Sequence, residues 1–156
     1  MTGGTLAGIR VLDLSGMLSG PYATMMLADH DAKVIKIEDA GGDTSRMNGP
    51  FRDDDPARDW AGHFVSLNRS KKGVCLDLKS EAGKTALKHL VRHANVLVEN
   101  FRPGVMDRLG LSYKNLAETN RDWPMPQSAV SATRAPGKAH MPAGLPMTWW
   151  RSQWAG

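Results

Sequence analysis

The sequence predicts an α/β fold in which a parallel β-sheet carries helices on its faces. Two observations lead to this prediction. Short apolar runs rich in branched residues recur along the chain, and each has the length of a buried strand rather than a helix. Segments with helical patterns separate these runs, so strands and helices alternate. The runs are "GIRVLDL" at 8–14, "KVIKIE" at 33–38, "KGVCLDLK" at 72–79 and "NVLVEN" at 95–100.

The segments between the strands have helical patterns. The first helix is expected from about Pro21, because proline favours a first helical turn, and its apolar residues lie all round. The second, residues 80–94, begins with a Ser80 cap and carries one apolar face. Short helices are expected before Gly110, which closes the first of them, and over residues 113–120. The intervening residues 39–63 are predicted to form a polar loop.

Length and composition exclude several classes of protein. A chain of 156 residues with 41% hydrophobic residues is long enough for one domain with a real core. No apolar run is long enough to cross a membrane, and the N-terminus lacks the pattern of a signal peptide. The single Cys75 excludes an internal disulfide framework and a cysteine-rich zinc site. A cytoplasmic protein without a membrane partner is the simplest interpretation.

Charge and histidine spacing give no support for nucleic acid or metal binding. The net charge of +4 comes mostly from residues 121–156, which hold four basic residues against Asp122 alone. This is a weak argument for a nucleic-acid partner, and none is expected. Of the histidines, His89 and His93 have i,i+4 spacing, but no HExxH motif accompanies them. They are predicted to be surface residues.

In a parallel sheet, ligands bind beyond the carboxyl ends of the strands, so the segments that follow each strand hold the candidate site residues. After the first strand, the Gly-rich turn "SGMLSGP" either brings backbone N–H groups to a phosphate or is simply a tight turn. After the second, Asp43 and Arg46 pair with a substrate or with each other. Both alternatives remain open at each turn.

Two further segments carry cations. "LNRSKKGV" places Arg69, Lys71 and Lys72 before the third strand, where they hold phosphates or form a solvated face. "VENFRPG" places an amide, an aromatic ring and a guanidinium at the end of the fourth strand, where a nucleotide-like ligand can stack and be held by charge. Its Phe101 fits a core position equally well.

Together these segments resemble family III CoA-transferases, the CaiB/BaiF-like group that includes formyl-CoA transferase and carnitine CoA-transferase. The resemblance runs in unbroken order over about residues 6–120, through "LAGIRVLDLSGMLSGPYATMMLAD", "AKVIKIED", "GGDTSR", "LNRSKKGVCLDLKSEAGK" and "LVENFRPGVMDRLGL". It implies a Rossmann-like α/β domain, here incomplete, and a homodimer of interlocked chains. It also implies acyl-CoA and carboxylic acid substrates, with the coenzyme A thioester as substrate and no covalently bound cofactor.

The resemblance also implies which residues contact CoA. Cations would hold its phosphates and apolar side chains its adenine, with Arg69, Lys71 and Lys72 as helpers. The implied CoA-binding residues are Leu18, Ser19, Leu76, Asp77, Leu78, Lys79, Asn100, Phe101, Arg102 and Arg108.

Three features depart from the family pattern. Asp31 stands where the family prefers glycine after the first helix, at a position that often needs a left-handed backbone. Asp39 stands where proline or arginine is usual, so one cation that would meet CoA is missing. The family's nucleophilic aspartate, which forms covalent intermediates, lies further along the chain and has no counterpart here. We therefore expect a truncated chain, with no catalytic residue assigned, that is inactive alone.

Composition changes abruptly after Asn120, which divides the chain into residues 1–120 and 121–156. Four of the five Trp and five of the nine Pro lie beyond this point, where Ile, Phe and Tyr do not occur. Joining the last base of each codon to the next two restores family-like residues: Asp122–Trp123 forces Leu and Trp149–Trp150 forces Val. We expect a disordered tail read in a shifted frame, which sequencing the gene will test.

Two alternatives to a transferase remain. The related α-methylacyl-CoA racemases share the fold and use an acid/base pair on the α-carbon. A non-catalytic CoA-binding fragment is the other. The wording of "GGDTSR" and "LVENFRPG" favours the transferase.

Overall fold

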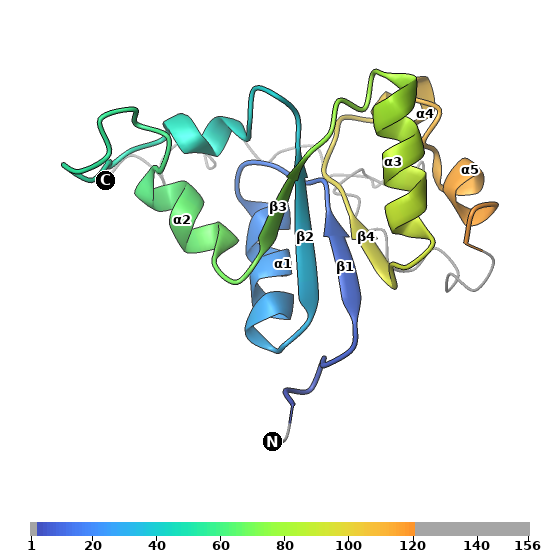
Figure 1. The fold of residues 1–156 in the computed structure, drawn as a ribbon, viewed down its shortest axis with the longest axis horizontal. Helices are drawn as coiled ribbons and strands as arrows, with labels where there is room; N and C mark the ends of the chain where they lie inside the picture. The colour runs from blue at the N-terminus through green and yellow to red at the C-terminus, as the bar shows by residue number, and fades with distance from the viewer. Residues whose placement is uncertain (1–2, 121–156) are drawn as a thin grey trace, which may run out of the picture.

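The fold is built on a four-stranded sheet in which all strands are parallel and lie in the order β3-β2-β1-β4. The computed structural model describes residues 3–120 (Figure 1), so the predicted tail at 121–156 and the proposed frame change lie outside the described residues. The strands are β1 (Arg10–Asp13), β2 (Lys33–Glu38), β3 (Lys72–Cys75) and β4 (Val96–Val98). The predicted α/β class with flanking helices is confirmed.

Three strands, β1, β3 and β4, are shorter than the apolar runs that predicted them, whereas β2 matches its run. β1 and β2 lie at the centre, with Val11 and Val34 opposite each other and buried. β3 is an edge strand that ends at Cys75. The hydrogen bond from Leu76 N–H to Glu38 O is the last one to β2 before the chain turns away. β4 ends at Val98 because Asn100 leaves the ladder to bond Gly16.

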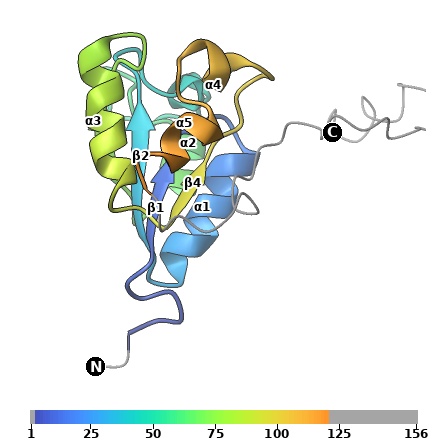
Figure 2. The same ribbon diagram turned by 90° about the vertical axis from the view of Figure 1, so that its right-hand side faces the viewer.

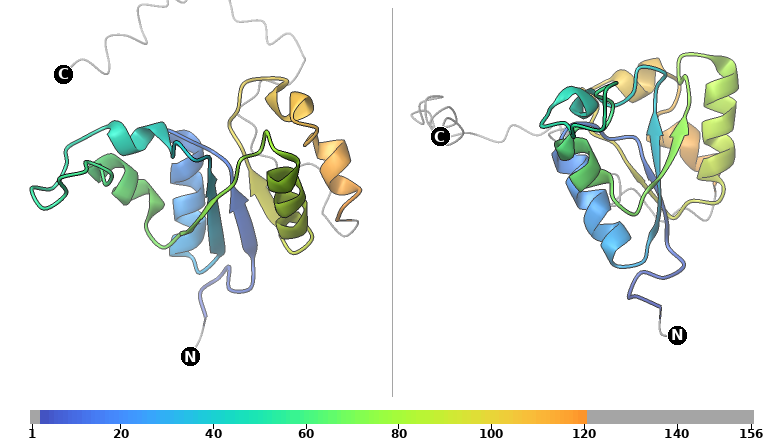
Figure 3. Two further views of the ribbon diagram at one scale, coloured as in Figure 1. Left: turned by 45° about the horizontal axis from the view of Figure 1, so that its top comes forward. Right: turned by 60° about the vertical axis from the view of Figure 1, so that its left-hand side comes forward.

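Helices cover both faces of the sheet, as Figures 2 and 3 show. Right-handed crossovers in one direction, from β1 to β2 to β3, place α1 (Ser19–Asp29) and α2 (Gly62–Asn68) on one face. The return from β3 across to β4 places α3 (Glu81–Val91) on the opposite face, joined there by α5 (Tyr113–Ala117). The direction of travel reverses between β1 and β4, which makes this the switch point of the sheet.

Each face has its own apolar core. Beneath α1, the core joins β1, β2 and β4 through Val11, Ala28, Ala32, Val34 and Val98. The larger core lies beneath α3 and α5, whose Leu87 and Leu116 are almost fully buried. Its buried members are Leu12, Leu14, Ile37, Leu87, Val91, Ala94, Leu97, Leu111 and Leu116.

The polar loop predicted over residues 39–63 is partly wrong. It contains the 3₁₀ helix η1 (Thr44–Met47), and α2 begins at its end, at Gly62. α2 was missed because it is short and its only sequence signal is a pair of apolar residues at i,i+3, Phe64 and Leu67, both of which are buried. α2 packs beside α1 and brings the segment before β3 under the sheet.

The local predictions at helix ends are largely confirmed. α1 begins at Ser19, two residues before the expected start, and Pro21 sits in the first turn, where its missing N–H costs no intrahelical bond. Asp31, which follows α1, has φ of 72°, the left-handed backbone expected there, and its carboxylate accepts a hydrogen bond from Gly4 N–H. Gly110, with φ of 70°, follows α4 (Val105–Arg108), and Ser80 caps α3.

Candidate functional site

A cleft of about 360 Å³ lies at the carboxyl ends of the strands and is lined in part by residues of η1 and α4. Segments that follow all four strands line it, together with α4. Its walls are mainly apolar, and they continue the core beneath α3. The apolar lining residues are Leu14, Ile37, Leu76, Leu78, Phe101, Val105 and Leu109.

The loop between β3 and α3 forms one wall of the cleft. Asp77 Oδ1 accepts a hydrogen bond from Lys79 N–H at 2.9 Å, and Asp77 O accepts one from Ser80 Oγ at 2.8 Å. The same Ser80 Oγ caps α3 by accepting from Gly83 N–H at 3.0 Å. These bonds fix the loop in which Leu76 and Leu78 contribute apolar surface to the cleft, and the exposed Lys79 also lines it.

The segment after β4 supplies the opposite wall. Phe101 is half-buried, packs against the core beneath α3 and also lines the cleft, so the core position is confirmed and contact with a ligand stays a prediction. Asn100 is a clamp: its Oδ1 accepts from Gly16 N–H at 2.9 Å and its Nδ2 donates to Gly16 O at 2.8 Å. Arg102 and Arg108 are exposed and do not line the cleft.

The structure therefore brings together half of the residues expected to contact CoA. Leu76, Asp77, Leu78, Lys79 and Phe101 line one cleft. Leu18 and Ser19, at the start of α1, are exposed and lie outside it, as do the two arginines. Asn100 lies beside the cleft with both ends of its amide bonded to backbone.

The phosphate-binding role expected for Lys71 is wrong. Its side chain is 1% exposed, and its ammonium lies 2.9 Å from Asp13 Oδ2, itself fully buried. It also donates to Pro21 O, Thr24 Oγ1 and Asn68 Oδ1 at 2.7 to 3.0 Å. Burial lowers the pKa of Lys71, and the neighbouring Asp13 opposes that change. Lys71 ties β1, α1 and α2 together beneath the site.

The two other cations near Lys71 in the sequence, Arg69 and Lys72, have different surroundings. Arg69 pairs with Asp29 at the end of α1, whereas Lys72 is exposed on the edge strand.

Comparison with known proteins identifies the family. The family model described as CoA-transferase family III matches residues 6–122. The chain belongs to CoA-transferase family III. The predicted resemblance is thereby confirmed.

Relatives within the family carry transferase names. A succinyl-CoA:mesaconate CoA-transferase from Haloarcula hispanica is 44% identical over 119 residues, which cover 76% of this chain and 30% of that protein. A formyl-CoA:oxalate CoA-transferase from Streptomyces coelicolor is 44% identical over 120 residues, 77% of this chain and 28% of the relative. This chain thus spans about 30% of the length of the family members it matches.

A solved structure supports the fold assignment. A CaiB/BaiF family protein from Brucella suis superposes with a TM-score of 0.71 and 36% identity over 76% of this chain and 32% of that one. The parallel sheet described here is therefore a fold that the family shares.

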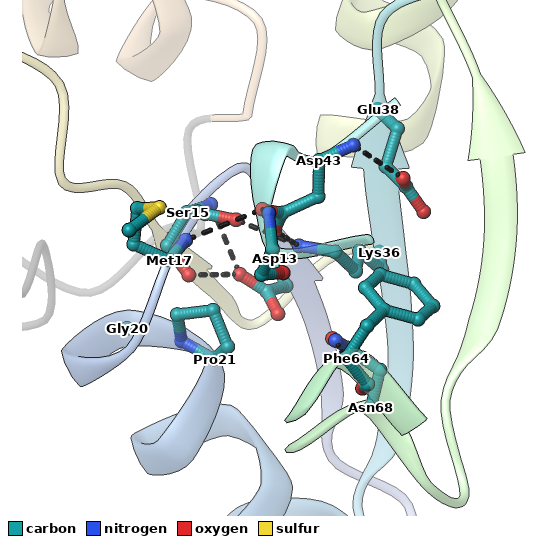
Figure 4. Close-up of polar contacts among 12 residues, drawn as sticks. Asp13, Ser15, Met17, Gly20, Pro21, Lys36, Glu38, Asp43, Phe64 and Asn68 are labelled. Carbon is teal, nitrogen blue, oxygen red and sulfur yellow. Dashed lines mark hydrogen bonds and ion pairs between the residues drawn. The ribbon is translucent and has the colours of Figure 1, made fainter. Parts of the chain in front are cut away.

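A second buried ion pair, which sequence reasoning missed, lies in the lining of the cleft of this family member. Lys36 Nζ lies 2.9 Å from Asp43 Oδ2 and donates to Ser15 O at 2.8 Å, with both charged side chains almost fully buried (Figure 4). Burial alone would raise the pKa of Asp43, but hydrogen bonds from Ser45 and the Lys36 ammonium outweigh it and hold that pKa below its ordinary value. The signal in "KVIKIE" was a single lysine between the apolar residues Ile35 and Ile37, and Lys36 occupies a buried position of β2.

Arg46, for which two roles were left open, pairs within the protein. Its guanidinium binds Glu38 through both carboxylate oxygens at 2.8 and 2.9 Å and lies 3.7 Å from the centre of the Phe64 ring. Burial alone would raise the pKa of Glu38, but the hydrogen bonds from Arg46 and from Asp43 N–H outweigh burial and hold that pKa below its ordinary value. Glu38 and Asp43 are thus each paired with a cation. Three other charged side chains of the cleft have no ion pair among the described residues: Asp39, Asp77 and Lys79.

Other expectations concern ligands and membranes. Among residues 3–120, no cluster of three potential metal ligands occurs, and His89 and His93 are exposed. No helix within that part of the chain is long and apolar enough to cross a membrane.

Proposed function

We propose that the cleft binds the nucleotide end of a coenzyme A thioester, and that the complete enzyme transfers CoA from an acyl-CoA to a small carboxylic acid. The observation that carries this proposal is that apolar walls formed by Leu76, Leu78 and Phe101 share the cleft with the exposed cation Lys79. A flat adenine ring fits between such walls, and a cation at the rim attracts phosphate. The names of the relatives, which move CoA between succinyl-CoA or formyl-CoA and a dicarboxylic acid, support this substrate class.

CoA binding to the purified chain tests the cleft. Isothermal titration with CoA is expected to show one site, and Phe101→Ala is expected to weaken it about tenfold, a loss of about 1.4 kcal/mol. Lys79→Ala is expected to weaken binding most at low salt, where an exposed cation is screened least. Lys72→Ala is the matched control, because Lys72 is a neighbouring exposed lysine outside the cleft. Equal affinity in the Phe101 variant and the parent chain would contradict the cleft as the CoA site.

Transfer itself is proposed to need sequence beyond the family-like part. The resemblance places the nucleophilic aspartate beyond residue 120, and the match to the family model stops at residue 122. We expect no transfer by the 156-residue chain, and transfer by a version whose reading frame is shifted back at codon 121. The measurement is the formation of a new thioester from an acyl-CoA and a carboxylic acid. Transfer by the 156-residue chain would refute this proposal, whereas CoA binding without transfer by either chain would indicate a non-catalytic CoA-binding fragment.

We further propose a homodimer for the complete enzyme and a cytoplasmic location. Exposed apolar side chains recur every four residues, at Leu18 just before α1 and at Tyr22 and Met26 within it, and form a stripe suited to a protein interface. Light scattering on the frame-restored chain measures the mass that tests the dimer.

A further inference from the structure

Three consecutive backbone donors in the turn between β1 and α1 are already occupied. In dinucleotide-binding α/β folds, the N–H groups of this turn point at a ligand phosphate. Here three consecutive N–H groups donate to side-chain oxygens of the protein itself. Ser15 N–H donates to Asp13 Oδ1 at 3.0 Å, Gly16 N–H to Asn100 Oδ1 at 2.9 Å, and Met17 N–H to Asp43 Oδ1 at 3.4 Å.

Of the three residues that accept these hydrogen bonds, Asp43 is the one farthest along the chain from the end of a strand. It lies in the loop after β2, and its carboxylate sits over the turn (Figure 4): a Cβ built on Gly16 would lie 3.6 Å from Oδ2. The carboxylate is 2% exposed and also accepts from Ser45 N–H at 2.9 Å and Ser45 Oγ at 2.8 Å. An anion is thus already built into the space above the turn.

Lys36 supplies the matching positive charge. Its ammonium contacts Asp43 Oδ2 at 2.9 Å and Ser15 O at 2.8 Å, so one cation holds both the anion and the backbone beneath it. Because Lys36 is buried, removing Asp43 would leave an uncompensated charge in the protein interior. Such a site attracts a small anion from solution.

We propose that Asp43 is an internal substitute for a ligand phosphate: with Lys36 as its counter-cation, its carboxylate occupies the β1–α1 turn and excludes phosphate from it. The phosphates of any ligand in the cleft then contact other groups. If the proposed CoA binding is correct, the foremost of those groups is Lys79, the cation that lines the cleft after β3. The role of Asp43 itself does not depend on that proposal.

Thermal unfolding of the Asp43→Ala variant tests the inference. In buffer without multivalent anions, its unfolding midpoint is expected to fall by roughly 10 °C or more, because Lys36 loses its partner. Adding inorganic phosphate is expected to restore much of this loss, while sodium chloride at equal ionic strength is not. The parent chain and Asp39→Ala, which removes an exposed carboxylate of the same cleft, are expected to show the same small response to both salts.

A second variant keeps the test decisive. In Lys36→Met/Asp43→Ala, the cation is gone as well, and phosphate is expected to give no specific rescue. If Asp43→Ala does not fold without phosphate, its refolding yield with phosphate and with chloride replaces the midpoint. A loss of stability that phosphate and chloride restore equally, or a parent chain that gains as much from phosphate as the variant does, would overturn the proposal. Calorimetric titration of the parent chain with CoA tests the proposed function separately, because CoA binding to that chain does not depend on how the Asp43 variants respond to phosphate.

Discussion

Replacing Lys71 by methionine is expected to lower the free energy of unfolding by about 3 to 5 kcal/mol, which is typical when one partner of a buried ion pair is removed. Methionine fills a similar volume, so the loss comes from charge and not from a cavity. Asp13, which is fully buried, would keep its hydrogen bonds from Ser15 and Thr24 but lose its only cationic partner among the described residues. Urea denaturation followed by circular dichroism measures the change.

The control for this variant is Lys72→Met, one residue away. Lys72 is exposed on the edge strand, so its replacement is expected to change stability by no more than about 0.5 kcal/mol. A double variant, Lys71→Met with Asp13→Asn, is expected to recover part of the loss, because it no longer buries an unpaired charge. Equal stability of the Lys71 and Lys72 variants would show that the buried pair contributes nothing.

Lys71 also shows where prediction from sequence ends. Its sequence neighbours, two more cations within four residues, are typical of a phosphate site or a solvated face. The acceptors that bury it come from Asp13 in β1, from Pro21 and Thr24 in α1 and from Asn68 in α2, up to 58 positions away. No local pattern contains such a pairing. Because α2 was itself missed, the segment that carries Lys71 beneath the sheet was missed with it.

The strands and the cleft were predictable for a different physical reason. Strand position depends on local apolar runs, and in a parallel sheet the carboxyl ends of those runs must meet at one edge. The strand pattern alone therefore predicts that Lys79 and Phe101, at or just after the ends of two predicted strands, lie at the same edge, and both line the cleft, as does Leu76, which only the family resemblance had indicated. Orientation at that edge was not predictable: Asn100 and Arg102 are two positions apart, yet one is bonded to Gly16 while the other is exposed.

The second large effect is expected from Gly83→Ala, in the first turn of α3. In an ordinary helix this change stabilises by roughly 0.5 to 1 kcal/mol. Here a Cβ on Gly83 would collide with the carbonyl carbon and oxygen of Asp77, which are backbone atoms of the cleft loop and cannot rotate away. We therefore expect the opposite sign, a destabilisation of about 1 to 3 kcal/mol by urea denaturation.

The collision between the new Cβ and Asp77 is also expected to weaken CoA binding. To admit the new methyl group, Asp77 must move away from α3, and Leu76, Leu78 and Lys79 move with it because they share the loop. CoA affinity is therefore expected to fall together with stability. Gly73→Ala is the matched control, since a Cβ at that position on β3 meets nothing within 4 Å. A Gly83→Ala chain that is destabilised but binds CoA as tightly as the Gly73 variant would separate the loop from the binding site, and one that gains stability would refute the close approach of α3 to Asp77.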